Sequence, residues 1–73
     1  MRTEKRTLPE IIRSIHGMGD DGLSNAEVAA SLRIPEAVVR DANRGRLPGQ
    51  IWWDKASPAT VAWLARHYPA TLA

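Results

Sequence analysis

Residues 24–46 read SNAEVAASLRIPEAVVRDANRGR, and their pattern indicates two short helices with a turn between them. Ser24 and Glu27 are spaced as a capping box, in which the serine hydroxyl accepts the glutamate N–H and the glutamate side chain reaches back to the serine N–H. The helix that they open is expected to run from Asn25 to about Leu32. It is rich in alanine, whose small side chain lets a second helix approach closely.

The turn is predicted from Pro35. The residue before a proline, here Ile34, is driven out of the helical conformation, so the first helix must end before it. Proline is well tolerated at the first position of a helix, so Pro35 can open the second helix, which we expect to stop near Gly45. Two short helices joined in this way are typical of a helix-turn-helix.

This stretch resembles the helix-turn-helix of Cro- and CI-type phage repressors. In that family a small residue lies where the two helices cross, which here is Ala29. Apolar residues flank the turn, here Leu32 and Ile34, and a β-branched residue of the second helix packs inward, here Val39. The family usually places a left-handed glycine where this chain has Arg33, and a non-glycine there costs on the order of 1 kcal/mol. The resemblance implies a DNA-binding regulator of a phage or mobile element.

A second resemblance starts at the end of the second helix. The run Arg44-Gly45-Arg46-Leu47-Pro48 is similar to the segment that leads into the wing of phage excisionases and MerR-type winged helices. Residues 48–56 therefore have two interpretations. A short helix is preferred and would favour a repressor-like protein, whereas a strand over residues 50–53 would favour an excisionase-like architectural protein. Both families bind double-stranded DNA.

The second helix has two unlike faces. At about 100° per residue, Val38, Val39 and Ala42 share one face with Pro35, and charged or amide side chains share the other. Arginine on the outer face suits guanine, asparagine suits adenine, and glutamate can accept a hydrogen bond from cytosine. From this wheel and the resemblance, the predicted DNA-contacting residues are Glu36, Ala37, Arg40, Asp41, Asn43, Arg44 and Arg46. Among these, Asp41 suits a phosphate-rich surface only if a basic side chain pairs with it.

The net charge of the chain is small, at +2, but the basic and acidic residues are unevenly distributed along it. Residues 33–55 contain five basic and three acidic residues, whereas residues 7–32 contain one basic and four acidic residues. We expect residues 1–6 to form a flexible basic arm in front of a single DNA-binding domain over residues 7–73. The weaker phosphate-contact candidates are Arg2, Lys5, Arg6 and Arg33.

The flanking segments indicate further helices. Thr7 and Glu10 form another capping box, and the helix behind them is expected to stop at Gly17, before a loop that reaches Gly22. Near the other end, Ser57 is the expected N-cap of a helix that starts at Pro58 and stops at Pro69. Val61, Leu64, Ala65 and Tyr68 are predicted to share one face of this helix. The fold class is therefore all-α, with four or five short helices in a compact bundle.

Three tryptophans lie within residues 52–63, in a chain without phenylalanine. Adjacent tryptophans on a helix point about 100° apart, so the pair at 52 and 53 cannot both face one small core. Exposed aromatic residues favour interfaces, and we expect a homodimer. The predicted dimer or partner surface contains Trp52, Trp53, Val61, Trp63 and Leu64. The same surface supports the alternative of a protein-interaction module of the phage-inhibitor or antitoxin type.

Several classes of function are disfavoured. The chain has no cysteine, which excludes disulfides and thiolate metal sites. His16 and His67 stand alone in sequence, and the run Asp20-Asp21-Gly22 lacks the alternating ligands of a calcium loop, so we expect no metal and no cofactor. No nucleophile–base pair is recognisable, so we expect no enzyme. No apolar run approaches the ~20 residues of a membrane span. We expect a cytoplasmic protein, associated with the nucleoid when bound to DNA.

Overall fold

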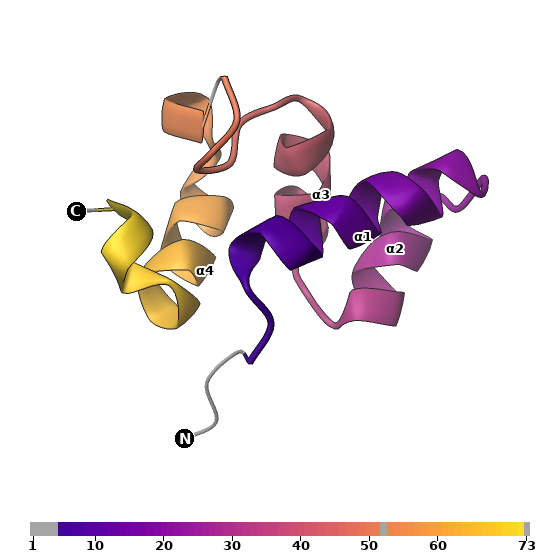
Figure 1. Cartoon of the computed structure of the whole chain (residues 1–73), viewed down its shortest axis with the longest axis horizontal. Helices are drawn as coiled ribbons and strands as arrows, with labels where there is room; N and C mark the ends of the chain where they lie inside the picture. The colour runs from indigo at the N-terminus through magenta and orange to yellow at the C-terminus, as the bar shows by residue number, and fades with distance from the viewer. Residues whose placement is uncertain (1–4, 52, 73) are drawn as a thin grey trace.

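The computed structural model describes residues 5–51 and 53–72. All regular structure in these residues is helical, which confirms the all-α prediction. The elements are α1 (Leu8–Asp20), α2 (Asn25–Leu32), α3 (Glu36–Asn43), the 3-10 turn η1 (Trp53–Lys55), α4 (Pro58–His67) and the 3-10 turn η2 (Pro69–Leu72). Figure 1 shows α1 running across α2 and α3, with α4 and η2 gathered beside them.

Helix α1 begins where the sequence predicts and ends later. The Thr7 hydroxyl accepts the Glu10 N–H at 3.2 Å, and the Glu10 carboxylate accepts the Thr7 N–H at 2.7 Å. The predicted stop at Gly17 is wrong, because the helix continues to Asp20. A glycine costs a helix only about 1 kcal/mol relative to alanine. The half-buried Met18 packs on the core and holds this last turn in place.

Helices α2 and α3 are joined by the turn Arg33–Pro35. The capping box of Ser24 and Glu27 is present at the start of α2. Arg33 adopts the left-handed conformation (φ 58°, ψ 47°), and the next N–H, of Ile34, donates to the Ala29 carbonyl at 3.0 Å. Helix α3 starts one residue later than predicted, with Pro35 as its N-cap. The chain therefore turns where the sequence predicts.

The core lies where α1, α2 and α4 pack around α3. Val38 and Val39 of α3 are completely buried, as are Ile11 and Ile15 of α1 and Leu64 of α4. Because α3 is covered on these sides, only one of its faces remains exposed to solvent.

The described residues of the segment after α3 form neither the predicted helix over residues 48–56 nor a strand. Its described residues contain turns and the short η1, and Trp52 lies outside the described residues. Gly49 has a positive φ of 91°, which a turn here requires. The Gln50 side chain then closes the turn, since its amide donates to the Ala42 carbonyl at 3.0 Å and its oxygen accepts the Leu47 N–H at 3.1 Å.

Helix α4 has the predicted start at Ser57 and Pro58 but a different inner face. The predicted face packs on the core only in part, because Leu64 is buried and Tyr68 half-buried, whereas Val61 and Ala65 are exposed. The residues that α4 buries are Thr60, Trp63 and Leu64. The helix is thus rotated by one residue relative to the hydrophobic pattern.

Candidate nucleic-acid interface

The outer face of α3, together with its C-cap residue, presents three exposed charged side chains, Glu36, Arg40 and Arg44. They lie opposite the buried Val38 and Val39, which confirms the predicted faces of the helix except at Pro35, which precedes the helix and is exposed. Ala37 lies beside them and is half-buried. This face is the surface on which the sequence places DNA contacts.

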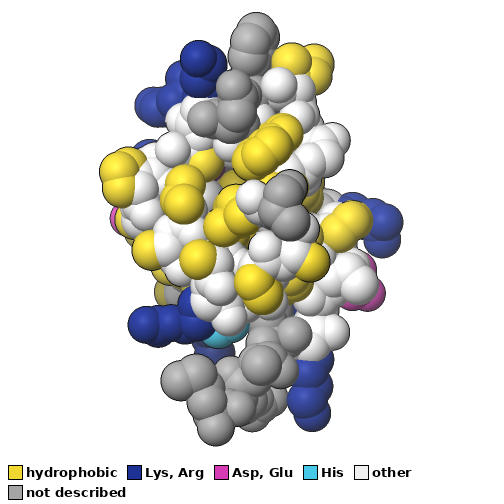
Figure 2. All heavy atoms as spheres, turned by 90° about the vertical axis from the view of Figure 1, so that its left-hand side faces the viewer, with side chains coloured by type: hydrophobic (Ala, Val, Ile, Leu, Met, Phe, Trp, Pro, Cys, Tyr) yellow, Lys and Arg dark blue, Asp and Glu magenta, His cyan; other side chains and the backbone are white. Residues whose placement is uncertain are grey.

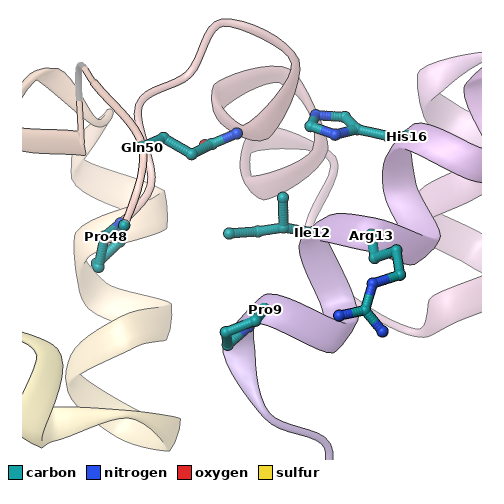
Figure 3. A pocket seen from close by; sticks show the side chains of 7 residues that line it. Pro9, Ile12, Arg13, His16, Pro48 and Gln50 are labelled. Atoms are coloured by element: carbon teal, nitrogen blue, oxygen red, sulfur yellow. The ribbon is translucent and has the colours of Figure 1, made fainter.

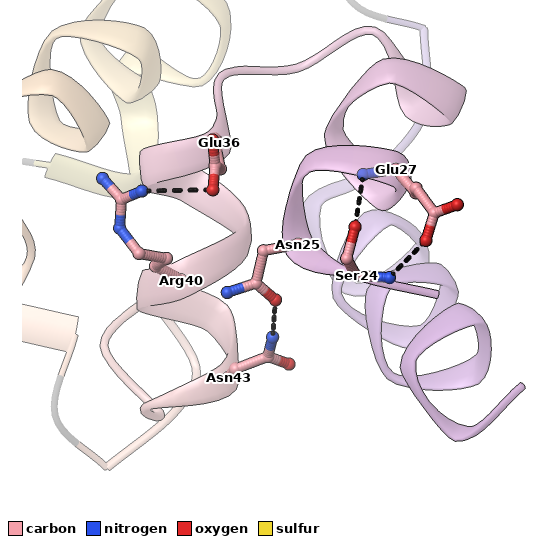
Figure 4. Close-up of polar contacts among 6 residues, drawn as sticks. All are labelled: Ser24, Asn25, Glu27, Glu36, Arg40 and Asn43. Carbon is pink, nitrogen blue, oxygen red and sulfur yellow. Dashed lines mark hydrogen bonds and ion pairs between the residues drawn. The ribbon is translucent and has the colours of Figure 1, made fainter. Parts of the chain in front are cut away.

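Glu36 and Arg40 form an ion pair one helical turn apart, shown in Figure 4, with 3.5 Å between the nearest nitrogen and oxygen. Both side chains are 48% exposed. An ion pair this exposed contributes at most about 1 kcal/mol and is screened by salt. The Arg40 guanidinium can therefore exchange this carboxylate for another acceptor at little cost.

Asn43 is exposed at the end of α3 and is held by a residue that the sequence prediction missed. Its amide nitrogen donates to the Asn25 side-chain oxygen at 3.0 Å, which joins the end of α3 to the start of α2 (Figure 4). This bond uses the nitrogen of one amide and the oxygen of the other, so the Asn43 oxygen can still accept a hydrogen bond and the Asn25 nitrogen can still donate one. Only tertiary packing brings these two residues together, so the sequence pattern contained no signal for the pair.

Asp41 does not belong to this surface, and its prediction as a DNA contact is wrong. The residue is 3% exposed, and its Oδ2 accepts hydrogen bonds from the Ser57 N–H and hydroxyl, both at 2.9 Å. The carboxylate therefore joins α3 to the first residues of α4.

The hydrogen bonds also decide the charge state of Asp41. Burial raises the pKa of this carboxyl, but hydrogen bonds from Thr60 and Ser57 and the positive charge of Arg46 outweigh burial, so the pKa lies below its usual value. Arg46 is half-buried, and its backbone N–H donates to the Asp41 backbone carbonyl at 2.8 Å. Arg46 thus helps to compensate Asp41 within the fold.

The predicted phosphate contacts occupy different environments. Arg33 and Lys5 are exposed, and Arg2 lies outside the described residues. Arg6 donates from Nη2 to the Leu32 carbonyl at 2.9 Å, and its own carbonyl accepts the Tyr68 hydroxyl. Arg6 is therefore tied to the end of α2 and to the chain after α4, and the prediction of a flexible arm is wrong at this residue.

The predicted partner surface is only partly exposed. Trp63 and Leu64 are buried in the core of this chain, so their prediction as partner contacts is wrong. Trp53 and Val61 remain, at 39% and 42% exposed, and Ile51, which the prediction missed, is 81% exposed. Figure 2 shows hydrophobic side chains gathered on the side of the molecule where α4 and η2 lie. Trp52 lies outside the described residues.

None of the helices in the described residues is long and apolar enough to cross a membrane. Comparisons with models of known protein families, with curated proteins and with solved structures found no match. The geometry of the chain itself is therefore the basis for a functional proposal.

Proposed function

We propose that this protein binds double-stranded DNA sequence-specifically, with α2 and α3 as a helix-turn-helix and the outer face of α3 in the major groove. The observation that carries the proposal is the composition of that face, where Arg40 and Arg44 are exposed on a helix whose other sides are buried. An α-helix fits the major groove, and arginine recognises guanine there. The resemblance to phage repressors supports a role as a transcriptional regulator of a phage or mobile element.

Backbone contacts would orient the helix in the groove. Arg33 projects from the turn before α3, and Lys5 lies ahead of α1; both are exposed cations suited to phosphates. Asn25 and Asn43 support each other beside α3 and offer amide groups to a base or a phosphate. The described residues thus supply both classes of contact that specific DNA binding requires.

The operator would be recognised by a homodimer. Trp53 and Val61, with Ile51, are the exposed apolar residues suited to the contact between two copies. Two such copies would bind half-sites about 34 Å apart, which is one turn of DNA.

Selection of bound duplexes from random DNA tests the proposal. We expect an enriched motif with two-fold symmetry, and an affinity for it that falls steeply between low and physiological salt, because bound phosphates release counterions. Failure to enrich any motif, with binding that does not respond to salt, would contradict DNA recognition.

The exposed apolar side chains favour a second candidate, the protein-interaction module. Such a module would bind a partner protein through Ile51, Trp53 and Val61, and this binding would be nearly insensitive to salt.

The excisionase-like alternative is also a DNA-binding protein. The strand that would favour it is absent from the described residues of the segment 47–56. Measuring the bend in bound DNA separates a simple regulator, which bends it little, from an architectural protein.

A further inference from the structure

A groove of about 340 Å³ lies between α1 and the turn at residues 48–50, on a part of the molecule that the DNA-binding proposal does not use. Figure 3 shows Ile12 in the middle of the groove, with Pro9 and Pro48 beside it and Arg13 and His16 along its α1 side. The volume is near the lower end of the range for small-molecule sites. The groove is thus suited to a small ligand.

The groove has a mixed lining, with Pro9, Ile12 and Pro48 as its apolar part and Arg13 and His16 as its basic part. Its lining contains two basic side chains, Arg13 and His16, and no acidic one. The nearby Glu10 carboxylate accepts a hydrogen bond from the Thr7 N–H at 2.7 Å, and this bond is the main reason why the pKa of Glu10 is lowered. The positive charge of Arg13 lowers that pKa least, so Glu10 is engaged with Thr7 and not with Arg13. The Arg13 guanidinium is exposed and makes no hydrogen bond or ion pair to any described residue.

The remaining polar side chain of the groove is already occupied. Both ends of the Gln50 amide are used, one by the Ala42 carbonyl and the other by the Leu47 N–H. His16 also approaches the Ala42 carbonyl, with 3.4 Å between Nε2 and the oxygen. Gln50 therefore acts as a rigid wall, and Arg13 is the group left to recognise a ligand.

From this charge pattern we propose that the groove binds a small carboxylic acid with an apolar body. The carboxylate pairs with the Arg13 guanidinium, which fits two carboxylate oxygens at once. The apolar body lies on Ile12 between Pro9 and Pro48. Because His16 and Gln50 both contact Ala42, binding also reaches the last turn of α3.

Titration of the ¹⁵N-labelled chain with benzoate, followed by NMR, tests this site. We expect saturable shifts at the amides of Arg13, His16 and Gln50, with smaller shifts at Ala42. Benzamide lacks the charge and acetate lacks the apolar body, so each should bind about tenfold more weakly than benzoate. Shifts that do not saturate, or equal titration by benzamide, would overturn the proposal.

Two matched variants complete the experiment. Arg13→Gln removes the charge from an exposed side chain and should weaken benzoate binding about tenfold. Arg66→Gln removes the same charge from α4, outside the groove, and should leave benzoate binding unchanged. Equal weakening by both variants would show that only net charge matters and would contradict a site at Arg13. DNA binding has no part in this experiment, so its outcome is independent of the proposed function.

Discussion

At the scale of single residues, Asp41 and Arg33 show what the sequence can and cannot predict. Arg33 adopts the left-handed conformation that the resemblance to repressors requires at this place, although it is not a glycine. The resemblance places Asp41 among the DNA-contacting positions of α3, yet it is buried beside Ser57 and Thr60, which follow it by 16 or more residues. A local pattern predicts a backbone turn, but it cannot predict a partner that is distant along the chain.

Asp41 leads to the first prediction. Replacing it with alanine leaves the Ser57 N–H and hydroxyl without their acceptor, which should lower the free energy of unfolding by about 1–3 kcal/mol. Urea denaturation at neutral pH measures this loss. The matched control is Glu36→Ala, which removes a carboxylate from the exposed face and should change stability by less than about 0.5 kcal/mol. Equal effects of the two variants would contradict the structural role of Asp41.

The pH dependence of stability follows from the same carboxylate. Because its pKa is lowered below the usual 3.8 in the folded chain, Asp41 stabilises the fold above that value, and this contribution is lost as the pH falls through the folded pKa. Asp41→Asn cannot titrate, so its unfolding free energy should decline less on acidification than that of the parent. Parallel pH profiles from urea denaturation would contradict this account.

At the scale of helices, the pattern predicted starts better than ends and faces. Both capping boxes are formed, because they depend on residues only three positions apart. Helix α1 continues past the predicted stop at Gly17, since the packing of Met18 outweighs the local cost of two glycines. The face that α4 buries differs from the hydrophobic pattern because the polar Thr60 is buried, with 3.2 Å between its hydroxyl and that of Ser57. Hydrophobicity alone cannot predict that pairing.

The crossing of α2 and α3 leads to a prediction at this scale. Ala29 is buried where these helices meet, so Ala29→Leu should overpack the crossing and lower the free energy of unfolding by about 1–3 kcal/mol. Ala30→Leu adds the same bulk on the exposed side of α2 and is the control. Thermal denaturation compares them, and two variants of equal stability would show that the helices do not rely on close approach at Ala29.

At the scale of the whole molecule, the arginines proposed to contact DNA and the most exposed apolar side chains lie on different elements. The exposed arginines of α3 form the proposed DNA surface, and the exposed apolar side chains lie around η1 and α4. Composition alone predicted neither distribution. The placement of the α3 arginines followed from helical periodicity, whereas the burial of Trp63 and Leu64 required the tertiary fold.

The apolar side leads to a prediction about assembly. Sedimentation equilibrium at tens of micromolar should show a dimer, and Val61→Glu should shift it to monomer, because a carboxylate would have to be buried in the contact. Arg66→Glu also adds an acid at an exposed position of α4, about 140° around the helix from Val61, and should remain dimeric. A parent chain that is monomeric at these concentrations would contradict the homodimer.

The proposal that α3 lies in the major groove is tested most directly at Arg44, which is exposed at the end of α3. The decisive measurement is selection from random DNA repeated with Arg44→Ala, with Arg66→Ala as the control that removes the same charge from α4. We expect Arg44→Ala to cost about 1–3 kcal/mol in binding and to relax the motif at one base pair of each half-site, while Arg66→Ala enriches the parental motif. An unchanged motif from Arg44→Ala at parental affinity would contradict the placement of α3 in the major groove.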